Sequence, residues 1–200
     1  MRFIRNIIII PTLLVCLVIL CACQFSPNHD TTTGTTTEST TGQSPYYSVE
    51  KYGIQLTVKF DKPVIQQGKN LILTAIVKNT RNSAIQYTLP SSTDNMHNEI
   101  IVKIADSSSG KSFIDADIFG KVETGMLKTV TLKSGESFTE VITFVPGYRT
   151  GGSWEILKDA KIKYFEAGEY AGTAQFEWDR KVGNSAVLEY LKLNFNVTIQ

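Results

Sequence analysis

Apolar and polar residues alternate along several stretches between residues 54 and 199, the pattern of β-strands with one buried face. The two clearest stretches cover 170–178 and 191–199. The same alternation predicts strands over 54–60, 85–89 and 100–104. Such strands form antiparallel sheets with one face in the core and the other in water.

Less regular patterns predict further strands. Residues 70–77 are apolar on both faces, as in a central strand. Pro90 is expected to close the predicted strand over 85–89. Strands over 127–132 and 138–145 are separated by the turn Lys133-Ser-Gly-Glu136.

Two segments are predicted by their turn residues. Asp106-Ser-Ser-Ser-Gly110 is a hairpin signal, and residues 153–164 favour one or two helical turns followed by a short strand. Together the patterns predict an all-β fold, an immunoglobulin-like antiparallel β-sandwich of about seven to nine strands. Gly168-Glu-Tyr170, at the start of a late strand, places Tyr170 in a tyrosine corner.

The first residues form a secretory signal. Two arginines, Arg2 and Arg5, precede an apolar run of 14 residues from Ile7 to Leu20, too short to span a bilayer comfortably. The following Leu20-Cys-Ala-Cys23 resembles the lipobox of bacterial lipoproteins. The resemblance implies a diacylglycerol on Cys23 and cleavage after Ala22, so that two acyl chains hold the protein to a membrane. The alternatives are an ordinary signal peptide and an uncleaved anchor.

The chain has three cysteines, Cys16, Cys21 and Cys23. Cleavage after Ala22 leaves Cys23 alone, so the exported part has no intramolecular disulfide and its core must stabilise it. Residues 31–42 contain eight threonines. Such a segment buries too little apolar surface to fold, and about 20 flexible residues reach about 25 Å. We therefore expect a signal peptide at 1–22, a flexible, disordered linker at 23–45 and the sandwich at 46–200.

Charge excludes one class of partner. Without Arg2 and Arg5 the chain has 18 basic and 19 acidic residues. The sequence has no stripe of basic residues of the kind that binds nucleic acid.

Three segments carry a family resemblance: 70–79, ending in Asn79, then Leu132-Lys-Ser-Gly-Glu136, then Phe165-Glu-Ala-Gly-Glu-Tyr170. They are similar to the BsuPI-type proteinase-inhibitor domain, which implies an immunoglobulin-like sandwich and protease inhibition. The sequence departs from that family in a polar loop at 90–98 and an insertion at 149–163. No inhibitory loop is matched residue by residue.

Catalytic motifs are absent from the sequence. Its histidines, His29 and His97, cannot form a two-histidine metal site, and there is no HExxH, P-loop or GxSxG. Asp115 and Asp117, with Asp106 or Asp94, could coordinate calcium or could simply face solvent. The pair Glu155 and Asp159 could serve a glycosidase. We expect a protein that is not an enzyme and needs no cofactor.

Three aromatic residues, Tyr148, Trp154 and Tyr164, lie in or beside the insertion. They could stack on sugar rings or anchor a protein partner, or they could cap the core.

The sequence therefore predicts a non-enzymatic binding or accessory module held to a membrane by Cys23, with contacts from loops 90–98, 106–111 and 146–160. A proteinase inhibitor and a glycan-binding module are the alternatives. The expected location is the extracytoplasmic face of a Gram-positive cell membrane. In a Gram-negative cell, Gln24 after the lipidated cysteine favours the outer membrane.

Overall fold

The structure is a computed structural model that describes residues 33–37, 46–62, 64–91, 99–117, 126–152 and 156–200. These residues form fourteen strands and one short 3-10 helix, so the predicted all-β fold is confirmed. All of them belong to one compact unit, Thr32–Gln200. The strand count exceeds the predicted seven to nine because several strands are short edge pieces.

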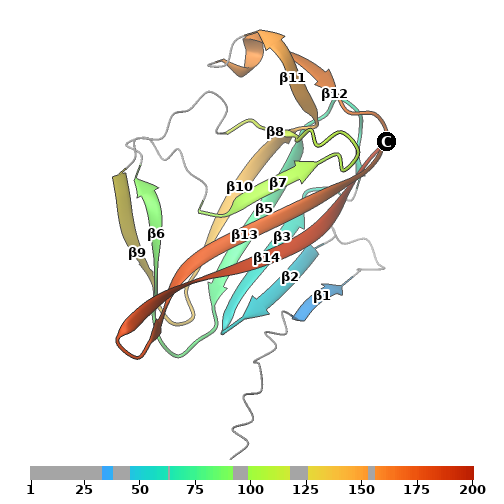
Figure 1. The fold of residues 1–200 in the computed structure, drawn as a ribbon. Helices are drawn as coiled ribbons and strands as arrows, with labels where there is room; N and C mark the ends of the chain where they lie inside the picture. The colour runs from blue at the N-terminus through green and yellow to red at the C-terminus, as the bar shows by residue number, and fades with distance from the viewer. Residues whose placement is uncertain (1–32, 38–45, 63, 92–98, 118–125, 153–155) are drawn as a thin grey trace, which may run out of the picture. The chain divides into compact units, whose positions relative to one another are not determined.

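Two six-stranded sheets face each other in a sandwich (Figure 1). The first sheet has the order β1 (Thr33–Thr37), β2 (Tyr46–Lys51), β3 (Ile54–Phe60), β5 (Leu71–Asn79), β10 (Ser137–Val145) and β8 (Ile114–Asp115). The second has the order β4 (Val64–Ile65), β14 (Ser185–Ile199), β13 (Gly168–Val182), β6 (Ile85–Ser91) and β9 (Met126–Leu132), and β7 (Ile101–Ala105) also pairs with β13. All pairs are antiparallel except β14 with β4.

A third, two-stranded sheet pairs β11 (Gly147–Gly152) with β12 (Ala160–Tyr164). The 3-10 helix η1 (Leu157–Asp159) precedes β12. This order, a helical turn followed by a short strand, is the one predicted for residues 153–164, of which 153–155 lie outside the described residues.

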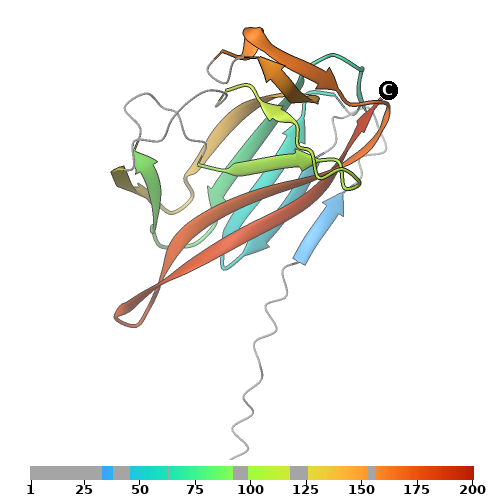
Figure 2. The same cartoon turned by 45° about the horizontal axis from the view of Figure 1, so that its top comes forward.

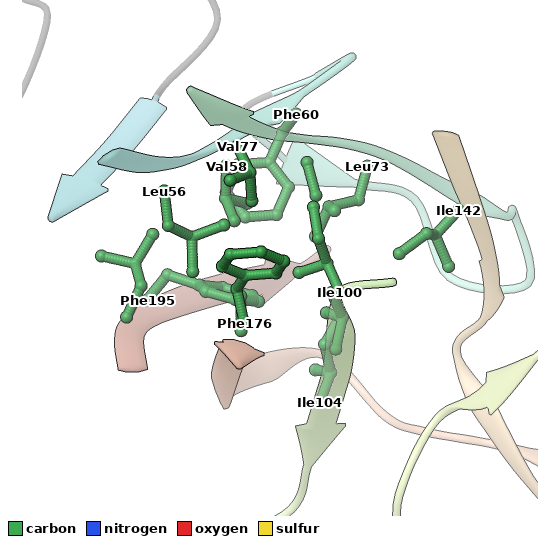
Figure 3. Packing of buried hydrophobic residues seen from close by; sticks show 14 of the residues in the cluster. Leu56, Val58, Phe60, Leu73, Val77, Ile100, Ile104, Ile142, Phe176 and Phe195 are labelled. Carbon is green, nitrogen blue, oxygen red and sulfur yellow. The ribbon is translucent and has the colours of Figure 1, made fainter. Parts of the chain in front are cut away.

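The core lies between the two large sheets, where the alternation in the sequence places it. Phe176 and Phe195 from the second sheet pack against side chains of the first, among them Leu56 and Val58 (Figure 3). Each of these four side chains is no more than 3% exposed. The period-2 segments at 54–60, 170–178 and 191–199 therefore fold as predicted, with the apolar positions inward.

The tyrosine corner is also confirmed. The hydroxyl of Tyr170 donates a hydrogen bond to the backbone carbonyl of Glu166, 2.7 Å away. The Tyr170 ring packs against Phe113 and Phe165, with ring centroids 5.3 and 5.1 Å distant. The bond fixes the connection that leads into β13.

Two strand predictions were wrong in part. β5 is not buried on both faces, because Ile72 is 41% exposed on the outer face of the first sheet. Pro90 does not close β6, which continues to Ser91 and pairs Pro90 with Leu127 of β9. Because β6 meets its other neighbour, β13, only at Gln86, the missing N–H of Pro90 is not needed there.

The Asp106–Gly110 segment forms the predicted hairpin turn, although its two arms pair only briefly, through Asp106 with Lys111 and Ile104 with Phe113. The N–H of Gly110 donates a hydrogen bond to the carbonyl of Asp106, 2.8 Å away. The Asp106 carboxylate accepts hydrogen bonds from the N–H of Ser108 and the hydroxyl of Ser109. After one bridge between Ala105 and Ser112, the chain leaves β7. The next strand, β8, pairs with β10 of the other sheet.

Part of the expected linker is a strand. Residues 33–37 form β1, which pairs with all of β2 except Lys51. Threonine is β-branched and suits an extended edge strand, which offsets the lack of large apolar residues. The remainder of the expected linker lies outside the described residues.

Candidate binding surface at the end of the β13–β14 hairpin

The hairpin of β13 and β14 is the longest element of the structure, with fifteen residues in each strand. Its end projects past the ends of β3 and β5 in both views (Figures 1 and 2). The turn is tight, since Val182 pairs with Ser185 and Gly183 has φ +60°. Glycine at the first central position suits a two-residue type II′ turn, whose twist matches the strands.

Large apolar side chains are exposed around this end. We call Tyr52, Val182, Val187, Leu188 and Tyr190 the hairpin-end patch; their exposed fractions run from 39% to 63%. Leu188 is the most exposed of the five, at 63%. Further along β13, Phe176 and Trp178 are buried. Large contiguous apolar patches mark interaction surfaces, whereas apolar residues exposed singly are ordinary.

A buried acid lies at the same end of the hairpin, on the inward face of β14. Glu189 is 9% exposed and accepts a hydrogen bond from Arg180 at 2.8 Å through one carboxylate oxygen. Its other oxygen accepts a bond from Lys51 at 3.2 Å. Both cations therefore compensate one buried carboxylate, as a buried acid requires.

The same two cations contact the aromatic members of the patch. The Lys51 ammonium lies 5.1 Å from the centre of the Tyr52 ring and 5.7 Å from that of Tyr190. The Arg180 guanidinium lies 4.3 Å from the centre of the Tyr52 ring. These cation–π contacts join the turn between β2 and β3 to the hairpin end.

The β2–β3 turn fixes the position of Tyr52. Lys51 pairs with Ile54, so the turn has two central residues, and both have positive φ: +51° at Tyr52 and +71° at Gly53. This is the type I′ hairpin geometry, in which glycine is favoured. A Cβ at Gly53 would lie 2.5 Å from Cγ of Arg81, so the turn has no room for a larger residue. The turn thus fixes the backbone of Tyr52.

A second polar cluster lies between the sheets, away from the patch. The Glu140 carboxylate on β10 accepts bonds from the backbone N–H groups of Glu99 and, at 3.2 Å, Ile100, while the Tyr87 hydroxyl donates to Glu99 at 2.6 Å. Burial raises the pKa of Glu140 to about 7, helped by the charges of Glu99 and Asp115 and opposed by the two N–H donors. Burial, followed by Glu99, also raises the pKa of Tyr87. Glu140 thus ties the first sheet to the start of β7.

The structure separates two of the three predicted aromatic residues. Tyr148 pairs with Lys163 and Gly147 with Tyr164, so Tyr148 and Tyr164 point to opposite faces of the small sheet. Tyr148 packs against Phe165, ring centroids 5.4 Å apart, with the Lys111 ammonium 3.7 Å from its own ring centre. Tyr148 therefore caps the core, the alternative reading, while Tyr164 is exposed and Trp154 lies outside the described residues.

The calcium candidates serve the backbone. Asp117 accepts a bond from the N–H of Thr143 at 2.7 Å, and Asp115 accepts one from the N–H of Asp117 at 2.9 Å. Hydrogen bonds hold the pKa of Asp106 down to about 2, the first of them from the Ser109 hydroxyl. Within the described ranges no three His, Cys, Asp or Glu residues lie together as metal ligands.

Several predicted residues lie outside the described residues: Ala22, Cys23, Asp94, His97 and Glu155. Among the described residues no helix is long and apolar enough to span a membrane. The lipid anchor therefore stays a prediction from the sequence.

The hairpin-end patch was not predicted. Its signal is present, because Leu188 and Tyr190 occupy positions that the alternation of β14 assigns to the polar, outward face, while Glu189 occupies an inward one. An inverted pattern at the end of a regular strand indicates a surface with a role outside the core. The turn residue Tyr52, far away in the sequence, could not be assigned to this surface without the fold.

No family model and no curated protein matches the chain. Among solved structures it is similar to a β-glucosidase from Erythrobacter marinus, with 18% identity and a TM-score of 0.35 over 72% of this chain and 15% of that one. A β-glucosidase from Listeria innocua has 14% identity and a TM-score of 0.35, and the match covers 78% of this chain and 17% of the glucosidase. The ASH/PapD-like domain of human CEP192 has 15% identity and a TM-score of 0.30 over 72% and 83%.

The chain thus spans less than a fifth of the length of these glucosidases. Similarities at these TM-scores carry no inference about activity or ligand.

Proposed function

We propose that this chain is a lipid-anchored extracytoplasmic protein whose sandwich binds another protein of the cell envelope through the hairpin-end patch. The observation that carries the binding proposal is that five large apolar side chains are exposed on the two faces of the β13–β14 hairpin end and on the β2–β3 turn, which the Lys51–Glu189–Arg180 cluster joins to it. The lipobox-like Leu20-Cys-Ala-Cys23 supports the anchor.

The composition of the patch favours a protein partner over a bilayer. Tyrosine and arginine are enriched at the centres of protein interfaces, where they supply most of the binding energy. The cations that contact the tyrosines of this patch, Lys51 and Arg180, both pair with Glu189. An anionic membrane surface would instead attract a cluster of uncompensated lysines and arginines.

Rigidity supports the same proposal. Tyr52 is fixed by its type I′ turn, and its ring is covered by Arg180. Binding therefore orders few side chains, which keeps the entropic cost of association low.

Site-specific photocrosslinking in cells that produce the full-length protein tests the binding surface. A photoreactive residue at Leu188 or Tyr190 should give one discrete adduct. The matched control is Val141, which is 61% exposed on the outer face of the first sheet. Leu188→Asp should abolish the adduct formed from position 190, whereas Val141→Asp should leave it unchanged. Equal adducts from 141 and 188, or none from 188 and 190, would contradict the proposal.

The anchor is tested separately. Metabolic labelling with palmitate should mark the wild-type protein and should disappear with Cys23→Ser, with release of the protein into the soluble fraction. Label that persists after the substitution would exclude Cys23 as the lipidation site, and would leave the binding surface to be judged on the crosslinks alone.

A further inference from the structure

The outer face of the first sheet carries a polar hollow that neither the core nor the hairpin-end patch uses. Its volume is about 660 Å³ on β2, β3 and β5, and its polar lining includes Tyr46, Ser48, Gln55, Thr57, Lys59 and Thr74. Strand register places Tyr46 opposite Lys59 and Lys59 opposite Thr74. A tyrosine, a lysine and a threonine thus form one row across three strands.

A second hollow of about 470 Å³ adjoins the first. Asp61 lines both, and the second continues over Lys62, Gln66, Lys69 and Asn70. The two hollows therefore form an elongated track along the end of β3 and the segment that follows it. An elongated track suits a chain of linked units better than a single small molecule.

Three features of the first hollow define the chemistry of its ligand. It is lined mainly by hydroxyl and amide groups, and its two charges, Lys59 and Asp61, have opposite sign, whereas the second hollow adds Lys62 and Lys69. A polyanion would require an excess of lysine and arginine in the first hollow as well. A protein hot spot would require exposed apolar anchors, and the lining of the first hollow has only Phe60, which is 6% exposed.

A neutral, hydroxyl-rich ligand meets all three conditions. Its hydroxyl groups can exchange hydrogen bonds with Gln55, Thr57 and Thr74, and the amphipathic ring of Tyr46 offers an apolar face with a polar edge. Ser48 is already fixed by Thr57, 3.0 Å away, and by the carbonyl of Leu56. The track stands on paired strands and is formed before a ligand arrives.

We propose that the first hollow binds a neutral oligosaccharide, with Tyr46 as the stacking platform, and that the chain of sugars continues toward the second hollow. The site is separate from the predicted set Tyr148, Trp154 and Tyr164, and it does not depend on the hairpin-end patch. The protein would then hold a glycan on one face of the sandwich and a protein partner at the hairpin end.

Isothermal titration tests the proposal with the full mature lipoprotein in a sugar-free amine-oxide detergent. The probes are hexasaccharides of β-1,4-glucose, β-1,3-glucose, α-1,4-glucose, mannose, xylose and N-acetylglucosamine. At least one should bind with a dissociation constant below about 1 mM, a gain of more than about 4 kcal/mol. Tyr46→Ala should weaken that binding at least about tenfold, the effect of losing about 1.4 kcal/mol of contact.

The matched control is Tyr164→Ala, which removes an exposed tyrosine from another sheet and should leave the affinity unchanged. Thr57→Arg, which fills the hollow from an outward strand position, should also abolish binding, and it serves if Tyr46→Ala does not fold. Binding of none of the six probes, or equal affinity of wild type and Tyr46→Ala, would overturn the proposal. Salt-sensitive binding of heparin in place of the neutral sugars would overturn it in favour of an anionic ligand. None of these results bears on the crosslinks from positions 188 and 190, so the two proposals fail independently.

Discussion

The side-chain amide of Asn79 donates a hydrogen bond to the backbone carbonyl of Leu132, 3.1 Å away, at a point where the two large sheets meet. The same amide nitrogen also contacts the carbonyls of Ser83 at 2.9 Å and Lys133 at 3.1 Å. Its oxygen accepts a bond from the N–H of Arg81 at 3.0 Å. Asn79 is fully buried and ends β5, so one side chain fixes the connections that lead from each sheet to the other.

We expect Asn79→Ala to destabilise the protein by about 2–3 kcal/mol, because the carbonyls that share its amide would be left without a donor. Urea unfolding of mature chain 23–200 carrying Cys23→Ser would measure the loss. Asn194→Ala is the matched control, since Asn194 is an exposed outward residue of β14. A loss no larger than that of the control would show that water replaces the Asn79 amide.

The tyrosine corner supports a smaller prediction. Tyr170→Phe keeps the ring among Phe113 and Phe165 but removes the bond to the Glu166 carbonyl. The expected loss is about 1 kcal/mol, or a fall of about 2–4 °C in Tm. Tyr164→Phe, at an exposed position, should leave Tm unchanged. An equal Tm for Tyr170→Phe and wild type would show that the hydroxyl bond adds no net stability.

The sandwich was predictable where one side chain in two is buried. Alternation placed β13 and β14 correctly because their inward positions, from Tyr170 to Trp178 and from Leu191 to Ile199, are apolar without interruption. The pattern wrongly assigned Ile72 to a buried face, because strands also carry β-branched apolar residues on their solvent-facing side. The 106–110 turn was recognised, but which strand follows it depends on long-range pairing that local sequence does not encode.

The candidate site was much less predictable. Tyr52 and Tyr190 share the Lys51 ammonium only because a turn of the first sheet lies beside the hairpin of the second. The polar track likewise depends on register, which sets Tyr46 beside Lys59 and Lys59 beside Thr74. The aromatic cluster around the insertion was conspicuous in the sequence, yet strand pairing divides Tyr148 from Tyr164.

Gly172 gives a third prediction, on packing. A Cβ at this position of β13 would lie 2.0 Å from the ring of Phe195, its cross-strand partner. Phe195 cannot easily move, because it is buried and packs on Phe60 and Tyr47. We expect Gly172→Ala to cost about 1–3 kcal/mol, as overpacking of a core does.

The control for Gly172 is Gly151→Ala in β11. There the nearest neighbour of an added Cβ is the side chain of Lys161 at 3.6 Å, an ordinary contact. This substitution should be neutral or slightly stabilising, because it restricts the unfolded chain. If both alanine variants unfold at the same urea concentration, Phe195 moves aside at little cost and the packing argument fails.

The last prediction concerns pH and rests on Glu140. Burial raises the pKa of this carboxyl from 4.5 in the ordinary state to about 7 in the folded protein. The folded state therefore binds the proton more tightly than the unfolded state. The protonated Glu140 side chain therefore contributes to the stability of the folded state; this contribution is fully present below pH 4.5 and is lost as the pH rises through 7. The free energy of unfolding should decline between pH 5 and 8 by less than about 1.4 kcal/mol per pH unit, because Glu140 is partly screened by solvent.

Glu140→Gln should flatten this dependence, since a glutamine has the shape of a protonated glutamate and does not titrate. Its amide oxygen can still accept the N–H of Glu99 or Ile100, so the start of β7 should remain attached to β10. Glu169→Gln, at an exposed position of β13, should leave the decline as it is in the wild type. Asp106 has a pKa of about 2, so the stability that depends on its ionised form is lost at a lower pH than the range in which Glu140 titrates. Wild type, Glu140→Gln and Glu169→Gln should therefore show the same loss of stability in strong acid. A decline between pH 5 and 8 that survives in Glu140→Gln would assign the titration to another group and leave Glu140 with a purely structural role.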